Sequence, residues 1–295
     1  MTQAPASSAL VTPAWLAQRI GQPGVKLIHL LYEHDIDDYV TGHLPGAVRW
    51  YWKDLLWHPE RRQFADPALV AERLGASGIG PDDTLVVYSG RAQYAMYGFW
   101  ILHEMNGHRD VRVLDGGMKR WTLDGNALTT DVPAVTSVPY PTQREARNDA
   151  SRVRRDDVLA NLDNPRRRLL DARDPSEYRG ERVKPAPGYD HGAESYGHIP
   201  GAVNVHARDL HDPADFTLLP RGELERIFRE AGAAPDQVDE VVTYCRLSHR
   251  GSGLWFAMTQ VLGWNHVRVY DGSWTEWGSS VDVPVERDSG LRTPR

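Results

Sequence analysis

The residues of this chain with the clearest capacity for chemistry surround its single cysteine, Cys245. A thiolate is the reactive form of cysteine, and cationic neighbours together with a helix N-terminus stabilise its charge. Two guanidinium groups, an imidazole and a hydroxyl follow this thiol within five positions. These following residues are Arg246, Leu247, Ser248, His249 and Arg250. The pattern predicts that Cys245 is a catalytic nucleophile and that the five residues after it bind an anionic substrate.

The segments on either side of these residues are the elements that must position them. Residues 241–244 are apolar and mostly β-branched, which predicts a buried strand, and residues 254–262 are apolar over a length typical of a helix. A loop that leads from a strand into a helix directs backbone N–H groups toward one point, where they bind anions. A lone cysteine can instead be a small buried hydrophobe. The charged loop favours the functional interpretation, because burying its cations without an anion is costly.

The composition excludes several classes of protein. The net charge is −6 and the pI is about 6.1, so we expect neither nucleic acid nor a membrane as a partner. One cysteine cannot form an internal disulfide, and no signal peptide or apolar stretch of about 20 residues is found, so we expect a cytoplasmic protein. No histidines have the spacing of metal ligands, so we expect no metal and no cofactor.

The first half of the chain alternates short apolar segments with segments of helical pattern. Residues 25–32, 84–88 and 111–114 have the composition of buried strands, whereas residues 12–21, 67–74 and 94–105 are predicted helices. Apolar strands that alternate with helices are typical of parallel sheets that are covered on both faces. The predicted fold class is α/β, with a mainly parallel sheet flanked by helices.

The second half repeats the first. The hexapeptide at residues 43–48 recurs in similar form 155 positions later at residues 198–203, and Tyr88 and Asp115 recur 156 positions later as Tyr244 and Asp271. Several matches in one order indicate a tandem duplication of one α/β domain. We expect an N-terminal domain over residues 1–135, a proline-rich linker over 136–150 and a catalytic C-terminal domain over 151–295.

Aligning the two repeats shows which residues of the cysteine loop are missing from the first repeat. At an offset of 156, Ser89, Gly90 and Tyr94 stand opposite Cys245, Arg246 and Arg250. The N-terminal copy is therefore expected to be non-catalytic and to cover one side of the active site. The C-terminal copy also carries about 16 extra residues at 180–195, since Tyr39 precedes His43 by 4 positions but Tyr178 precedes His198 by 20. This insert is either a lid or domain contact, or a tolerated surface loop.

Loop length bears on the reaction. Phosphatases with this strand–loop–helix arrangement use a C-x5-R loop that encircles a phosphate, whereas Cys245 and Arg250 form the shorter C-x4-R. A smaller ring suits the transfer of one sulfur atom through a persulfide. Two further alternatives are a phosphatase or arsenate-reductase-like enzyme and a non-catalytic persulfide carrier.

Three motifs resemble a known family. Residues 39–47, with Tyr39 and His43, are similar to its N-terminal signature, although Trp50 departs from the pattern just beyond it. Residues 270–277 are similar to its C-terminal signature, and the six residues from Cys245 match its active-site loop in length. Over nearly its whole length the chain resembles the tandem-domain rhodaneses (thiosulfate/3-mercaptopyruvate sulfurtransferases), most closely the bacterial thiosulfate sulfurtransferases.

The resemblance implies two rhodanese-like domains and a two-step reaction. Cys245 would attack the outer sulfur of a small anionic donor, and the persulfide would pass its sulfur to a thiophilic acceptor such as cyanide, a thiol or a sulfur-accepting protein. Basic residues such as Arg246, and a loop that ends in His249 and Arg250, favour thiosulfate as the donor. The alternative is 3-mercaptopyruvate.

The family also holds its donor with an arginine near the first strand of the C-terminal domain. The resemblance places that arginine directly before the aromatic residue Tyr178, but Glu177 stands there in this chain. Arg179 is the candidate that replaces it. Arg173 is expected to have a structural role, in a salt bridge with Asp171 or Asp174.

Overall fold

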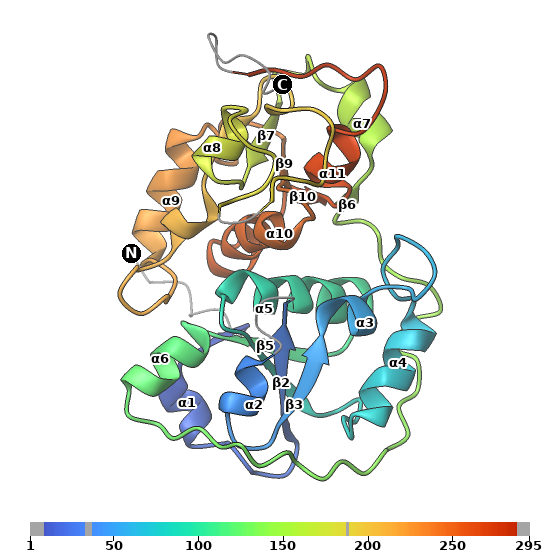
Figure 1. Ribbon diagram of the computed structural model, residues 1–295, viewed down its shortest axis with the longest axis vertical. Coiled ribbons are helices and arrows are strands. Elements are labelled where there is room, and N and C mark those ends of the chain that lie inside the picture. The colour runs from blue at the N-terminus through green and yellow to red at the C-terminus, as the bar shows by residue number, and fades with distance from the viewer. Residues whose placement is uncertain (1–8, 33–36, 187–188, 288–295) are drawn as a thin grey trace. The chain divides into compact units, whose positions relative to one another are not determined.

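The computed structural model describes residues 9–32, 37–186 and 189–287, and this part of the chain divides into two compact units (Figure 1). Unit 1 comprises the chain to Asp149 together with Asp212–Leu218. Unit 2 comprises Ala150–His211 and the chain from Leu219 onward. Each unit contains one of the two sequence repeats, and each is described separately below.

The described residues of unit 1 form a five-stranded sheet in which every neighbouring pair is parallel. The strand order is β1-β5-β4-β2-β3. The strands are β1 (Leu10–Val11), β2 (Val25–Leu31), β3 (Ala47–Tyr51), β4 (Thr84–Tyr88) and β5 (Asp110–Leu114). The central strands β2 and β4 are largely buried, as expected for a sheet that is covered on both faces.

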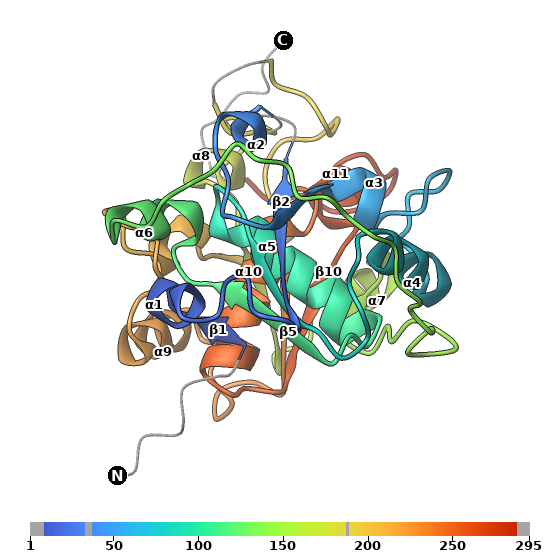
Figure 2. The ribbon, with the colours of Figure 1, turned by 90° about the horizontal axis from the view of Figure 1, so that it is seen from below.

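Helices cover both faces of this sheet. They are α1 (Pro13–Ala17), α2 (Asp38–Thr41), α3 (Trp52–Leu56), α4 (Pro67–Ala76), α5 (Ala92–Phe99), the π-helical turn η1 (Trp100–Met105) and α6 (Gly117–Leu123). In both views α1 and α6 lie together at one side of the unit, and α3 and α4 lie at the other (Figures 1 and 2). Helix α1 lies within the predicted helix of residues 12–21 but ends earlier, at Ala17. It begins where the Thr12 hydroxyl accepts a hydrogen bond from the Trp15 backbone N–H at 3.1 Å and Pro13 occupies the first turn.

Unit 2 repeats the architecture of unit 1. Its described residues form a five-stranded parallel sheet of order β6-β10-β9-β7-β8, which is the order of unit 1 with each strand replaced by its counterpart. The strands are β6 (Arg152–Val153), β7 (Arg167–Asp171), β8 (Val203–Asn204), β9 (Glu240–Tyr244) and β10 (Val267–Tyr270). The predicted α/β fold with two parallel sheets is therefore confirmed.

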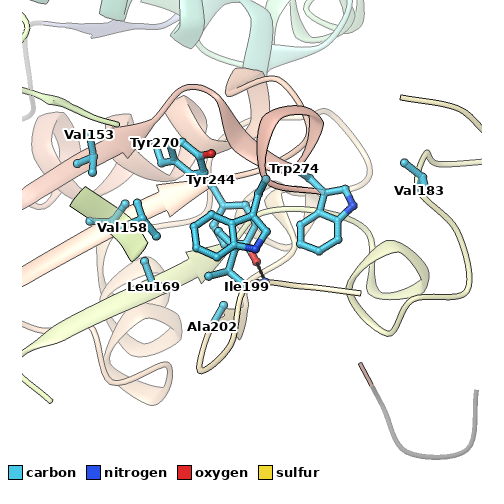
Figure 3. Close-up of a cluster of buried hydrophobic side chains, with 11 residues drawn as sticks. Val153, Val158, Leu169, Val183, Ile199, Ala202, Tyr244, Tyr270 and Trp274 are labelled. Carbon is cyan, nitrogen blue, oxygen red and sulfur yellow. Dashed lines mark hydrogen bonds between the residues drawn. The ribbon is translucent and has the colours of Figure 1, made fainter. Parts of the chain in front are cut away.

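The helical elements of unit 2 also match those of unit 1 in order. They are α7 (Arg155–Ala160), α8 (Pro175–Tyr178), the 3₁₀ turn η2 (Ala207–Leu210), α9 (Arg221–Glu230), α10 (His249–Phe256), the π-helical turn η3 (Ala257–Val261) and α11 (Ser273–Trp277). The predicted helix at 254–262 thus begins earlier, at His249, and follows β9 after only four residues. Figure 3 shows the apolar core of this unit, in which Tyr244, Tyr270 and Trp274 pack with Ile199 and Val158.

The repeated histidine turns have one structural role in both units. The ring of His43 stacks on Tyr39 at 3.8 Å between centroids, and the ring of His198 stacks on Tyr178 at 3.7 Å. The tyrosine that ends the central strand completes the turn, since the hydroxyl of Tyr244 accepts the Ile199 backbone N–H at 3.1 Å (Figure 3). This agrees with a structural rather than a catalytic role for His198.

Residues outside the repeats complete unit 1. The proposed linker region packs on this unit: the Tyr140 hydroxyl lies 2.7 Å from Nδ1 of His108, and Arg147 donates to the carbonyl of Phe64 at 3.1 Å. The segment Asp212–Leu218 also belongs to unit 1, where Asp215 accepts a hydrogen bond from Arg120 at 2.7 Å. Among the described residues, no helix combines the length and the apolar character needed to span a membrane.

Candidate active site

Cys245 follows β9 directly, at the carboxyl edge of the unit 2 sheet. The loops after β7, β9 and β10 meet at this edge, because parallel strands end on the same side. Cys245 is almost fully buried, with 1% of its surface exposed. The Thr243 hydroxyl donates to the carbonyl of Gly251 at 2.9 Å and ties β9 to α10. A Cβ at Gly251 would lie 3.2 Å from the Tyr244 backbone, so glycine allows this close approach.

The serine at the start of α11 organises the cysteine loop (residues 245–250). The Ser273 hydroxyl accepts hydrogen bonds from the backbone N–H of Cys245 at 3.2 Å and of Ser248 at 3.1 Å, and it donates to the carbonyl of Tyr270 at 2.9 Å. The next N–H of α11, that of Trp274, donates to the carbonyl of Cys245 at 2.9 Å. Ser273 therefore fixes the curvature of the loop from the neighbouring strand end.

Sequence reasoning did not single out Ser273, although a signal was present. The motif Asp271-Gly272-Ser273 differs from its unit 1 counterpart at its third position, where unit 1 has Gly117. Both residues adopt the left-handed region, with φ of 54° at Ser273 and 53° at Gly117. A non-glycine residue is uncommon in that region, so its presence beside the cysteine loop suggests a functional constraint.

Arg250 forms the main ion pair of the cysteine loop. Its two terminal nitrogens donate to Glu177 of α8, Nη1 to Oε2 at 2.5 Å and Nη2 to Oε1 at 3.0 Å. Glu177 is fully buried, and its Oε2 also accepts the backbone N–H of Asp174 at 3.0 Å in a capping box. Burial alone would lower the pKa of Arg250, but Glu177 and then Cys245 raise it above its ordinary value. Arg250 is therefore a charged guanidinium beside the thiol.

The other loop residues differ in exposure. Arg246 and Leu247 are partly exposed, whereas Ser248 and His249 are buried. Ser248 has a left-handed backbone with φ of 67°, and its hydroxyl donates to the carbonyl of Leu247 at 2.5 Å. The carbonyls of Ser248 and His249 accept from the backbone N–H and the hydroxyl of Ser252, at 2.7 and 2.9 Å. The loop is thus closed by the first turn of α10.

The insert at 180–195 packs against this loop rather than standing clear of the domain. Its residue Gly192 faces the Arg246 guanidinium, since a Cβ there would lie 3.0 Å from Nε and 3.4 Å from Cζ. The carbonyl of Ser195 accepts a hydrogen bond from the Trp274 indole at 3.1 Å. Near the other end of the insert, Val183 is buried in the core of unit 2. Nothing in the sequence pattern connects Gly192 with Arg246, 54 positions away.

The two arginines considered for donor binding have different surroundings. Arg173 is fully buried and forms a salt bridge with Asp171, with Nη2 to Oδ2 at 2.6 Å, while its guanidinium lies 4.4 Å from the ring of Trp274. Its predicted structural salt bridge is confirmed, with Asp171 as the partner. Arg179 directly follows α8, where it pairs with Glu181 at 2.7 Å and has 43% of its side chain exposed.

The unit 1 counterpart of the cysteine loop lacks more than the thiol. The connection between strand and helix has three residues, Ser89–Arg91, in unit 1 and four, Cys245–Ser248, in unit 2. Helix α5 begins at Ala92 and α10 at His249, so in helix register Gln93, not Tyr94, lies opposite Arg250. The Ser89 hydroxyl donates to the carbonyl of Arg91 within this shorter loop.

The comparisons with known proteins agree with this geometry. The family model described as rhodanese-like domain matches residues 12–124 and again residues 154–280. The chain belongs to the rhodanese family. The family predicted from the three sequence motifs is therefore confirmed, and each of the two rhodanese-like domains corresponds to one sheet.

Named relatives of this rhodanese include both enzymes and a carrier. A thiosulfate sulfurtransferase of Corynebacterium glutamicum is 36% identical over 280 residues, which cover 94% of this chain and 90% of that protein. The sulfur carrier protein TtuD of Thermus thermophilus is 36% identical over 286 residues, covering 94% of this chain and 96% of that protein. Among solved structures, an anaerobic ergothioneine biosynthesis enzyme from Chlorobium limicola has a TM-score of 0.80 at 27% identity, covering 95% of this chain and 69% of that one. Among the described residues of this rhodanese, no group of three or more histidine, cysteine or acidic side chains is arranged to hold a metal ion.

Proposed function

We propose that this rhodanese is a thiosulfate sulfurtransferase that carries sulfur as a persulfide on Cys245 and passes it to cyanide or a thiol. The supporting observation is the cysteine loop itself: a buried thiol follows β9, Ser273 shapes the loop, and Arg250 at its end pairs with Glu177. The names of relatives such as the C. glutamicum enzyme support thiosulfate as the donor. In this proposal the catalytic domain is residues 151–295, the N-terminal domain of residues 1–135 is non-catalytic, and residues 136–150 join them.

The reaction has two balanced steps. The Cys245 thiolate attacks the outer sulfur of thiosulfate, the S–S bond of thiosulfate breaks, and its electron pair leaves with sulfite. The three negative charges of the reactants are kept, one on the Cys245 persulfide and two on sulfite. Cyanide then attacks the terminal sulfur of the persulfide, and the electron pair of the broken S–S bond returns to Cys245 as thiolate. No proton, metal or cofactor enters either step.

The remaining site residues bind and orient the donor in this proposal. The N–H groups at the start of α10 have no carbonyl one turn earlier in the helix, so their positive dipole is available to an anion in the loop. Arg246 supplies charge to the sulfonate oxygens, Arg250 lies beside the donor with its charge offset by Glu177, and Leu247, Ser248 and His249 form the wall. Arg179, partly exposed at the end of α8, attracts the donor to this edge.

Mass measurement of the intact protein tests the proposal. After incubation with thiosulfate, the protein is expected to gain the mass of one sulfur atom and then lose it to cyanide as thiocyanate. Cys245→Ala should gain nothing, whereas Ser89→Ala, which removes the hydroxyl at the equivalent place in unit 1, should load as the unaltered protein does. Loading of Cys245→Ala, or no loading of the unaltered protein, would refute the persulfide on Cys245.

A second candidate function is that of a sulfur carrier, which the similarity to TtuD favours. In that case the persulfide would pass to a protein acceptor rather than to cyanide. Loaded protein that transfers its sulfur to a protein thiol much faster than to cyanide or to a small thiol would favour the carrier. A steady-state comparison of thiosulfate with 3-mercaptopyruvate tests the choice of donor.

The single reactive thiol suits a reducing compartment, so we place the protein in the cytoplasm.

A further inference from the structure

The charge balance of the cysteine loop depends on a residue outside it. Two cations, Arg246 and Arg250, belong to the loop, but they have different surroundings. Arg250 is in a bidentate pair with the buried carboxylate of Glu177, at 2.5 and 3.0 Å. Arg246 has no ion pair among the residues that the structure describes, and its Nε is a buried atom with no hydrogen-bond partner there. One of the two loop cations is therefore already neutralised.

The position of Glu177 is fixed independently of Arg250. Helix α8 begins with Pro175 after the cap Asp174, and Glu177, the third residue of the helix, forms a capping box with Asp174 in which its Oε2 accepts the Asp174 N–H. Turning the Arg250 guanidinium away from this carboxylate is costly, because it would leave the fully buried Glu177 without its charged partner, while Arg250 itself is only 14% exposed. Glu177 thus stays beside Arg250 whether or not an anion is bound.

We infer that Glu177 is a specificity-determining residue that lowers the affinity of the site for dianions. This inference rests on the proposed function, because it concerns the anion that the same loop binds. With Glu177 ionised, Arg250 and Glu177 cancel, and Arg246 and the backbone N–H groups meet the incoming anion. Thiosulfate as donor and sulfite as product both carry two charges, so a weaker site shortens the residence of the product and reduces blockage by other oxyanions such as sulfate.

The decisive variant is Glu177→Gln in the full chain, which keeps the side-chain shape and one acceptor oxygen. We expect the KM for thiosulfate and the inhibition constants of sulfate and sulfite to fall roughly tenfold, with no rise in kcat, since one negative charge near the loop has been removed. The inhibition constant of nitrate, a monoanion, should fall by no more than about threefold. Unchanged or higher constants for the dianions would overturn the inference.

Two further variants separate charge from positioning. Glu223→Gln removes one negative charge from an exposed ion pair with Arg226 on α9 and should leave all constants within about twofold. Glu177→Asp keeps the charge but shortens the reach. It should retain the wild-type preference between sulfate and nitrate if charge is decisive. If Glu177→Asp instead behaves as Glu177→Gln does, Glu177 only positions Arg250 and the inference fails.

A binding measurement on the unaltered protein does not depend on activity or on the folding of a variant. Competition between sulfate and nitrate for Cys245, followed as protection from a neutral alkylating reagent, reports the affinity of each anion. One net cation predicts a preference for sulfate below about thirtyfold, and two would exceed it. A larger preference overturns the inference even if sulfur transfer is observed. Conversely, a small preference in a protein that accepts no sulfur from thiosulfate keeps the inference and rejects the proposed donor.

Discussion

Two serines with left-handed backbones hold the cysteine loop at the level of single residues. Ser248 has φ of 67° and Ser273 has φ of 54°, a region that costs a non-glycine residue roughly 1–2 kcal/mol. The two are joined, because the N–H of Ser248 donates to the hydroxyl of Ser273 at 3.1 Å. The hydrogen bonds of the loop thus offset the backbone strain that gives the loop its shape.

Substitution of Ser273 should remove the hydrogen bonds that hold the cysteine loop in shape. In Ser273→Gly the backbone can keep its conformation, as Gly117 does in unit 1, but the N–H groups of Cys245 and Ser248 lose their common acceptor. We expect a loss of about 1–3 kcal/mol in the free energy of unfolding, measured with denaturant, and a tenfold or greater loss in the rate of sulfur loading. Ser248→Gly is the comparison: it relieves the same kind of backbone strain but leaves the Ser273 hydroxyl as the acceptor of both N–H groups, so stability should change by less than about 1 kcal/mol. Equal loading rates in the two variants would contradict this role.

At the scale of elements, the insert at 180–195 becomes part of the site because it packs on α11 and on Arg246. Gly192 has φ of 114° and lies against the Arg246 guanidinium. Gly192→Ala should displace that guanidinium and raise the KM for thiosulfate about threefold to tenfold, in steady-state assays. Gly201→Ala is the matched control, since Gly201 also has a positive φ, 73°, but nothing lies near its Cβ position. A rise in KM for both variants would show that backbone strain, not contact with Arg246, is the cause.

The strands and helices around the site could largely be predicted from sequence, whereas its ion pairs could not. Residues 84–88 and 241–244 are apolar and bounded by turn residues, so periodicity and composition predict their strands. The pairing of Arg250 with Glu177 joins residues 73 positions apart, and depends on β7 and β9 being neighbours in the sheet. Local pattern carries no information on such a pair. Helix α10 begins earlier than its apolar segment at 254–262 predicts, because His249 and Arg250, polar in sequence, belong to its first turn.

At the scale of the whole molecule, unit 1 is built from two separate parts of the chain. Asp115 accepts the N–H of Leu218 at 2.9 Å, and Arg120 pairs with Asp215 at 2.7 Å, so Asp212–Leu218 is held by residues of the first repeat. Burial raises the pKa of Asp115 to about 6, with Asp215 adding to the rise. This carboxyl therefore binds a proton more tightly in the folded than in the unfolded chain.

The raised pKa of Asp115 should be visible in the pH dependence of stability. Because the folded pKa lies above the unfolded value of about 4, ionised Asp115 costs stability above pH 6, and the cost disappears as the pH falls below 4. Asp115→Asn should be more stable than the unaltered protein at pH 7. This difference in unfolding free energy should be up to about 3 kcal/mol larger at pH 7 than at pH 4. The counterpart Asp271→Asn should instead lose stability, since Asp271 pairs with Arg152 at 2.7 Å. A gain in Asp115→Asn that does not vary with pH would contradict this explanation.

The loop of unit 1 differs from the cysteine loop of unit 2 by more than the cysteine. Ser89–Arg91 is one residue shorter than Cys245–Ser248, and Gly117 has no hydroxyl to hold a loop in position. Ser89→Cys alone would place a thiol in unit 1 without the surrounding loop conformation that Cys245 has in unit 2. To reproduce the geometry of the cysteine loop, unit 1 would need an inserted residue and a serine in place of Gly117 as well as the cysteine. If Cys245 carries the reaction, as proposed, no single substitution would transfer that role to unit 1.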